Sequence, residues 1–161
     1  IRRHITLLAL CYRDGFKKLL GNAMTHRTPD HFKQTTEGVD YAGDHLLVEF
    51  WDASNLADIE VIRDALESSA VAAGATLLHS HYHRFGDGGG VSGVSVLAES
   101  HITIHTWPER GFAAIDVFMC GHCDPHDCLP DLKHCLSPQT VKTQLLRRGE
   151  VGTAEQVQAV A

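Results

Sequence analysis

The chain has 161 residues, of which 43% are apolar and 21% charged, values close to those of an average soluble globular domain. This length suits one domain with its own core, and the composition excludes a disordered or collagen-like chain. The formal net charge is −6 and the basic residues form no cluster, which argues against nucleic acid or an anionic membrane as partner.

The first 43 residues differ from the rest of the chain. Residues 1–20 mix basic side chains with leucines, and residues 25–40 are polar with few apolar positions. We expect residues 1–43 to form a peripheral, partly disordered extension that begins with a frayed amphipathic helix. Residues 44–149 are expected to form the folded domain, and residues 150–161 a loose C-terminal tail.

A regular pattern of secondary structure begins at Asp44. Residues 45–51 are short and apolar-rich, as in a buried strand. Asn55 is predicted to cap a helix that continues through Ala73 and stops before Gly74. Its apolar side chains recur every three or four residues, at Leu56, Ile59, Ile62 and Leu66.

Further strands follow this helix. Several of them alternate apolar and polar residues, and they are predicted at residues 75–85, 91–98, 101–107 and 112–119, with a last strand at 140–146. A short helix is predicted at residues 130–136. The order β-α-β-β-β-β-α-β predicts an α+β fold, a two-layer sandwich with a mainly antiparallel sheet and its helices on one face.

Cysteine and histidine are distributed unevenly. Four of the five cysteines lie between Cys120 and Cys135, which does not resemble a disulfide framework and favours a reducing cytoplasm. Ligand-type side chains are dense here: Cys120, His122, Cys123, His126, Cys128, His134 and Cys135. The spacing fits no usual pair of zinc knuckles, so we predict no metal site and keep a non-catalytic metal-binding module as an alternative. His79, His81 and His83 share one strand face, as solvated or interface histidines would.

Three motifs in the second half of the chain occur in a specific order. They are GVSGV at residues 90–94, ESHITIHTWPE at residues 99–109 and AAIDVFMCG at residues 113–121. In sequence and spacing they resemble the bacterial and archaeal S-adenosylmethionine decarboxylases, small proenzymes that cut themselves at a Glu-Ser bond. The resemblance extends from about residue 45 to residue 149.

This resemblance implies self-cleavage between Glu99 and Ser100. A serine hydroxyl can attack the carbonyl that precedes it, and elimination from the resulting ester leaves a residue that becomes a pyruvoyl cofactor. The family pattern assigns His105 as the base for the elimination and Ser92 as the hydroxyl that stabilises the intermediate. Ser100 and His105 are separated along the predicted strand. Since the base has to reach residue 100, we expect folding to bring His105 close to Ser100.

The resemblance also assigns the decarboxylation. Cys120 matches the proton donor, and thiols, with an ordinary pKa of about 8.5, are mostly protonated at neutral pH. Glu109 matches the glutamate that binds the ribose hydroxyls, while Trp107 and Phe85 are candidates for stacking on the purine. The pyruvoyl carbonyl would form a Schiff base with the substrate amine.

The family further implies a homodimer of cleaved protomers, with active sites near the interface that draw residues from both chains. Its product, decarboxylated S-adenosylmethionine, is an aminopropyl donor for spermidine synthesis.

One segment departs from the family pattern. Residues 86–90, Gly-Asp-Gly-Gly-Gly, are longer by one residue than the usual segment and lack its proline. Phe85 would then lie out of register with the usual stacking aromatic, in a more flexible loop. An altered pocket leaves free arginine or ornithine as alternative substrates of the same chemistry. The retained Glu109 and Trp107 favour S-adenosylmethionine.

Overall fold

The computed structural model describes residues 31–151 of the chain. The helix expected in residues 1–20 and most of the C-terminal tail lie outside these residues, so both stay predictions. None of the helices in residues 31–151 is long and apolar enough to span a membrane.

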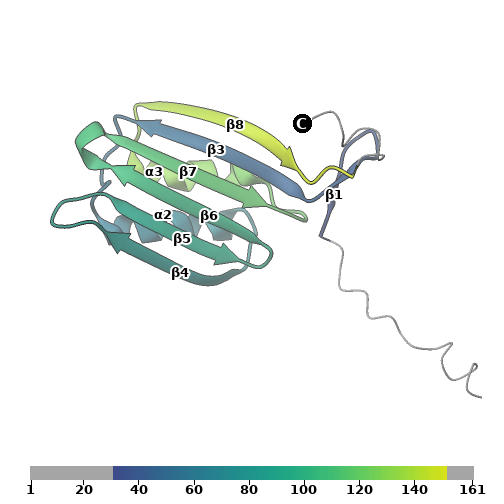
Figure 1. The fold of residues 1–161 in the computed structure, drawn as a ribbon, viewed down its shortest axis with the longest axis horizontal. Helices are drawn as coiled ribbons and strands as arrows, with labels where there is room; N and C mark the ends of the chain where they lie inside the picture. The colour runs from purple at the N-terminus through teal and green to yellow at the C-terminus, as the bar shows by residue number, and fades with distance from the viewer. Residues whose placement is uncertain (1–30, 152–161) are drawn as a thin grey trace, which may run out of the picture. The chain divides into compact units, whose positions relative to one another are not determined.

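The main structure is a six-stranded antiparallel sheet in the order β4-β5-β6-β7-β3-β8 (Figure 1). Its strands are β3 (Gly43–Trp51), β4 (Leu77–Arg84), β5 (Val91–Leu97), β6 (Ser100–Trp107), β7 (Phe112–Met119) and β8 (Thr140–Arg148). All six predicted strands are present, with ends shifted by no more than two residues. The predicted fold class is therefore confirmed.

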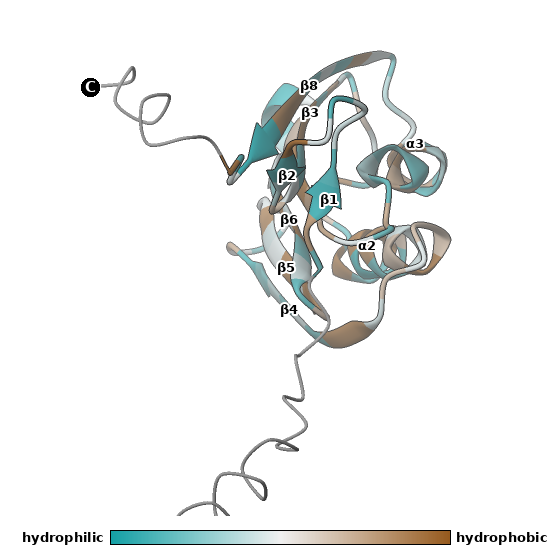
Figure 2. Cartoon of the chain, turned by 90° about the vertical axis from the view of Figure 1, so that its right-hand side faces the viewer, coloured by the Kyte–Doolittle hydropathy of each residue, from teal (hydrophilic) through white to brown (hydrophobic). Residues whose placement is uncertain are grey.

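Two helices, α2 (Ile59–Ala72) and α3 (Leu129–Leu136), lie on the same side of this sheet (Figure 2). The predicted cap of the first helix was wrong. Asp58 is the N-cap, and its carboxylate accepts hydrogen bonds from the backbone N–H groups of Glu60 and Val61. Asn55 instead has a positive φ of 62° and donates to the carbonyl of Cys135 at 2.8 Å, which ties this loop to the end of α3.

The core lies between the helices and one face of the sheet. Alternate residues of the central strands, such as Phe50 and Ile104, are fully buried against Ile62 and Leu66 of α2. Burying a side chain of this size contributes about 1.5–3 kcal/mol. The alternation therefore assigns a face to every residue of these strands.

No helix of residues 31–151 covers the other face of the sheet, which we call the open face (Figure 2). His101, Thr103, His105 and Trp107 of β6 lie on it, and Trp107 is 41% exposed. His79, His81 and His83 of β4 lie on the same face, because they pair with Val96, Val94 and Ser92. Ser100 has the opposite parity and belongs to the core face.

Two shorter strands, β1 (Lys33–Gln34) and β2 (Asp40–Tyr41), pair with each other ahead of the main sheet. Two short 3₁₀ helices, η1 (Pro108–Arg110) and η2 (Pro125–Cys128), follow β6 and β7. The domain boundaries expected at residues 43 and 149 stay predictions.

Candidate active site

The bond between Glu99 and Ser100 lies at the tip of the β5–β6 hairpin. Leu97 pairs with Ser100, so Ala98 and Glu99 alone form the turn. Glu99 has a φ of 65°, a left-handed conformation that costs a residue with a Cβ about 1–2 kcal/mol. The predicted scissile bond therefore follows directly after a strained residue.

Cys120 contacts both groups that would react in the cleavage. Its backbone N–H donates to Ser100 Oγ at 3.1 Å, and its thiol donates to the carbonyl oxygen of Glu99 at 3.1 Å. The Ser100 Oγ to Cys120 Sγ distance is 3.3 Å, and Ser100 is 8% exposed. The thiol thus lies against both the hydroxyl and the carbonyl of the predicted cleavage site.

Ser92 and His105 lie together at the other end of the same hairpin. The β5–β6 register pairs them directly, and Ser92 Oγ is 2.8 Å from His105 Nδ1. His105 is five residues beyond Ser100, about 17 Å along an extended strand, and lies on the open face. The fold of one chain therefore does not bring His105 to Ser100, contrary to expectation, because β6 runs as regular strand from one to the other.

A pocket of about 250 Å³ lies beside His105. Its lining residues are Phe85, Gly90, Ser92, His105, Thr106, Trp107 and Glu109. The structure thus brings together the three predicted substrate-binding residues and the Ser92–His105 pair. The longer loop leaves Phe85 in this pocket, with its ring 59% exposed.

Gly90 explains how that loop is held against β6. A Cβ at Gly90 would lie 2.0 Å from the carbonyl oxygen of Thr106, which is far too close for any side chain. The adjacent Val91 N–H donates to Thr106 Oγ1 at 2.7 Å. The Thr106 hydroxyl in turn donates to the carbonyl oxygen of Leu56. These contacts fix the backbone on either side of the pocket.

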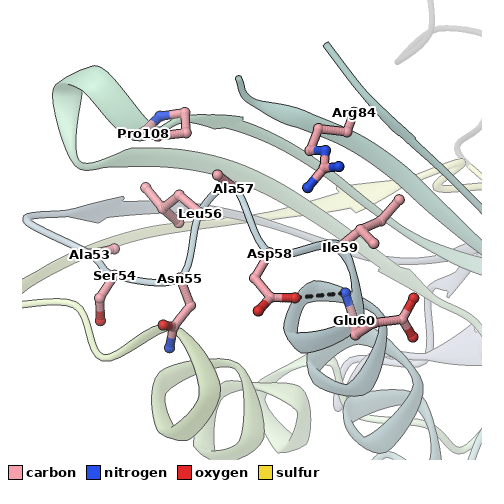
Figure 3. Close-up of a pocket in the computed structure, with 10 residues that line it drawn as sticks. All are labelled: Ala53, Ser54, Asn55, Leu56, Ala57, Asp58, Ile59, Glu60, Arg84 and Pro108. Carbon is pink, nitrogen blue, oxygen red and sulfur yellow. Dashed lines mark hydrogen bonds between the residues drawn. The ribbon is translucent and has the colours of Figure 1, made fainter. Parts of the chain in front are cut away.

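A larger, more open depression of about 660 Å³ lies between the loop before α2 and the side chains of Arg84 and Pro108 (Figure 3). Asp58 and Glu60 also line it, and Figure 3 shows the Asp58 carboxylate engaged with the Glu60 N–H. Its lining contains no cysteine, histidine or residue of the three motifs other than Pro108. The chemistry of cleavage is therefore better supported at Ser100 than at this depression.

His31 is a contact of the cleavage site that sequence reasoning missed. Its Nδ1 lies 2.8 Å from the Glu99 carboxylate, and its carbonyl oxygen accepts from the Gly121 N–H at 2.8 Å. In the sequence, His31 belongs to the segment that is expected to be a peripheral extension. No local pattern could have found it, because its partners are distant in the sequence.

Three thiols and one histidine of the open face have pKa values shifted by their surroundings. Burial raises the pKa of the Cys128 thiol to about 12, and it also raises the pKa of Cys123 and Cys135. Burial and the neighbouring His45 lower the pKa of His101, while Asp116 partly opposes this shift. Within residues 31–151, no three His, Cys, Asp or Glu side chains are grouped so as to hold a metal ion.

Comparison with known proteins identifies the family of this chain over the same region that carries the three motifs. Residues 44–149 match the family model described as S-adenosylmethionine decarboxylase. The chain is 43% identical over 116 residues to the S-adenosylmethionine decarboxylase proenzyme of Methanococcus maripaludis strain C7, with 70% of this chain and 94% of that protein covered. It is 44% identical over 119 residues to the proenzyme of Thermosipho melanesiensis, with 70% and 91% covered.

A solved structure agrees with these sequence matches. The crystal structure of the adenosylmethionine decarboxylase from Aquifex aeolicus superposes with a TM-score of 0.63 at 34% identity. The alignment covers 70% of this chain and 94% of that one. The residues matched by the family model, 44–149, include both ends of the β5–β6 hairpin.

Proposed function

The chain belongs to the S-adenosylmethionine decarboxylase family, and we propose that it cuts itself between Glu99 and Ser100 and then decarboxylates S-adenosylmethionine at a site built from two copies. The observation that carries this proposal is the set of contacts at the β5–β6 turn. There a strained Glu99, a buried Ser100 hydroxyl and the Cys120 thiol meet within 3.3 Å of one another's polar atoms.

The cleavage uses groups of the chain itself. Ser100 Oγ attacks the Glu99 carbonyl carbon, and the C–N bond breaks to give an ester and a free amine on residue 100. The Cys120 thiol supports this step by donating to the carbonyl oxygen as negative charge develops there. A base then removes the Cα proton of residue 100, and the Cβ–O bond breaks to release the Glu99 carboxylate.

Hydrolysis of the dehydroalanine left at residue 100 releases ammonia and completes the pyruvoyl group. The surroundings of Ser100 fit a small uncharged group, because the side chain is almost fully buried beside the Cys120 backbone N–H and thiol. When present, the pyruvoyl group supplies an electrophilic carbonyl and an acceptor for the electrons released with CO₂. Cys120, already in contact with residue 100, is placed to return a proton to the substrate α-carbon.

The base for the elimination comes, in this proposal, from a second copy of the chain. His105 and Ser92 lie far from Ser100 of their own chain but face outward on the open face. A two-fold axis between two open faces, perpendicular to the strands, reverses the strand direction and brings the His105 end of one copy to the Ser100 end of the other. Apolar side chains on that face, such as Trp51, Trp107 and Leu146, support its burial in a homodimer.

The substrate assignment is supported by the pocket beside His105. Phe85 and Trp107 offer aromatic faces for a purine, and Glu109 offers a carboxylate for two ribose hydroxyls. The exposed ring faces also suit the positive sulfonium centre. Free arginine or ornithine has neither a purine for the aromatic pair nor ribose hydroxyls for Glu109. The product would serve as aminopropyl donor in spermidine synthesis, and the need for a reduced Cys120 favours the cytoplasm.

The first test is the intact mass of the purified chain under denaturing conditions. Cleavage at residue 99 gives pieces of 99 and 62 residues, about 11 and 7 kDa of the 17.7 kDa total. The smaller piece is expected to begin with a pyruvoyl group. Release of CO₂ from S-adenosylmethionine, but not from arginine or ornithine, would then support the substrate. An uncut Ser100-containing chain would contradict the proposal.

A further inference from the structure

We propose that His31, which lies outside the family-matched residues 44–149, is a positioning residue for self-cleavage: it holds the Glu99 side of the scissile bond against the Cys120 loop. This inference rests on the proposed function, since it concerns the rate of the same cleavage. It goes beyond that function because it gives the segment before the family domain a role in the reaction.

His31 bridges the two segments that form the cleavage site. Its side chain lies 2.8 Å from the Glu99 carboxylate in the β5–β6 turn. Its backbone carbonyl accepts from the N–H of Gly121, the residue after Cys120. One residue therefore fixes both the carbonyl that is attacked and the thiol that contacts it.

Lys33 anchors the segment that carries His31. Its ammonium group donates to Asp44 at the start of β3 at 2.7 Å and to the carbonyl oxygen of Cys123 at 2.6 Å. Both side chains of the Lys33–Asp44 pair are largely buried, with 12% and 15% exposed. The position of His31 is thus set by an ion pair on one side and by the Cys120–Cys123 segment on the other.

The conformation of Glu99 explains why such a hold matters. A left-handed Glu99 relaxes readily into an ordinary turn unless its surroundings oppose the change. A rotation of this peptide would take the carbonyl oxygen away from the Cys120 thiol. A tether on the Glu99 carboxylate opposes that rotation and keeps the attacked carbonyl in place, and misplacement by about 1 Å can reduce a rate by about 100-fold.

The test is the cleavage rate of the full chain made in cell-free translation. Labelled methionine at Met24 and Met119 marks both fragments, because the two residues lie on either side of the cleavage site. We expect His31→Ala to cleave about tenfold more slowly than the wild type. His31→Asn, whose amide N–H lies near the position of Nδ1, is expected to restore the rate to within about twofold. His122→Ala is the matched control. His122 is an exposed histidine two residues after Cys120, and its variant should cleave at the wild-type rate.

Folding is checked separately in the Ser100→Ala background. There His31→Ala should lower the Tm by less than about 3 °C, because a half-exposed ion pair contributes at most about 1 kcal/mol. If the wild type cleaves and His31→Ala cleaves at the same rate, this inference is overturned while the proposed function stands. A His31→Asn chain as slow as His31→Ala would overturn it as well. A wild-type chain that stays intact would contradict the proposed function itself.

Discussion

The two ends of the β5–β6 hairpin carry different chemistry. At the turn, a buried hydroxyl and a thiol lie against the peptide bond that follows a strained Glu99, and His105 of the same strand lies at the opposite end. At the far end, Ser92 and His105 form a hydrogen-bonded pair on the open face, next to an aromatic pocket. In the proposed two-copy site each end supplies half of the reacting groups, and the β6 strand keeps the two halves of one chain apart.

The two ends also differ in how the chain holds them. The turn end is fixed by long-range contacts from His31 and Cys120, whereas the far end is fixed mainly by strand pairing, with one added long-range contact from the Thr106 hydroxyl to the Leu56 carbonyl. Strand register is robust because a slip of one residue would turn every buried side chain outward. The turn end therefore depends on residues that the hairpin does not contain, and it is the end more sensitive to distant substitutions.

The largest effect on self-cleavage is expected when Ser100 and His105 are removed from different chains. Ser100→Ala removes the nucleophile and His105→Ala removes the proposed base, so each variant expressed alone should stay uncut. When the two are co-expressed, a mixed dimer pairs the intact Ser100 of one chain with the intact His105 of the other. We expect the His105→Ala chain, and not the Ser100→Ala chain, to be cleaved, as measured by intact mass.

This experiment separates a shared site from a site within one chain. Differently tagged copies allow the mixed dimer to be purified, and a Ser100→Ala,His105→Ala double variant paired with His105→Ala, which keeps one Ser100 but no His105, gives the matched blank. If His105→Ala cleaves alone at the wild-type rate, His105 is not the base. If mixing never restores cleavage, the two-copy arrangement is wrong.

A smaller but still large effect is expected at the turn end. Cys120→Ala removes the proposed proton donor, and loss of a general acid lowers a rate by about 10²–10⁴-fold. We expect kcat for CO₂ release from the cleaved protein to fall by about that factor. Cys123→Ser, three residues along the same loop, should leave kcat within about twofold, because it is the carbonyl of Cys123 and not its thiol that binds Lys33. Equal losses in both variants would contradict the assigned role.

At the far end, Glu109→Gln tests substrate binding. Replacing a carboxylate that accepts two hydrogen bonds weakens binding by about 1.5–3 kcal/mol, or about 10- to 100-fold. We expect KM for S-adenosylmethionine to rise by this factor while cleavage of the chain is unaffected. Glu60→Gln, in the neighbouring depression of Figure 3, is the control and should leave KM unchanged. If Glu109→Gln slows self-cleavage, Glu109 takes part in cleavage, and its assignment to substrate binding alone is contradicted.

Some of these features were predictable from the sequence, and others were not. The strands and the single-sided helix layer follow from alternation, which is local. The assignment of Phe85, Trp107 and Glu109 to substrate binding came from the family resemblance alone, and only the structure shows that they line one pocket. The helix cap was misassigned because Asn55 and Asp58 are both good caps, and only the contact of Asn55 with Cys135 decides between them. The contacts of His31 depend on tertiary placement, which local patterns do not encode. The separation of Ser100 from His105 follows from the predicted strand itself, and the error lay in expecting the fold of one chain to close that gap.

The smallest expected effect lies between the two ends, at His101 on the open face. Burial and His45 lower its pKa in the folded chain, so the unfolded chain binds this proton more readily. The folded chain is therefore most stable with His101 neutral, above the unfolded pKa of about 6.5. Its free energy of unfolding decreases as the pH falls through that value, because the unfolded chain takes up the proton first. In the uncut Ser100→Ala background, His101→Gln should reduce the fall in Tm between pH 7.5 and 5.5, whereas His122→Gln should not. If the open faces pair and bury His101, unfolding is coupled to dissociation of the two copies, and the Tm of the uncut chain should rise with protein concentration. A Tm that does not depend on concentration would mean that the open face stays exposed, and the two halves of the site would then have no means of meeting.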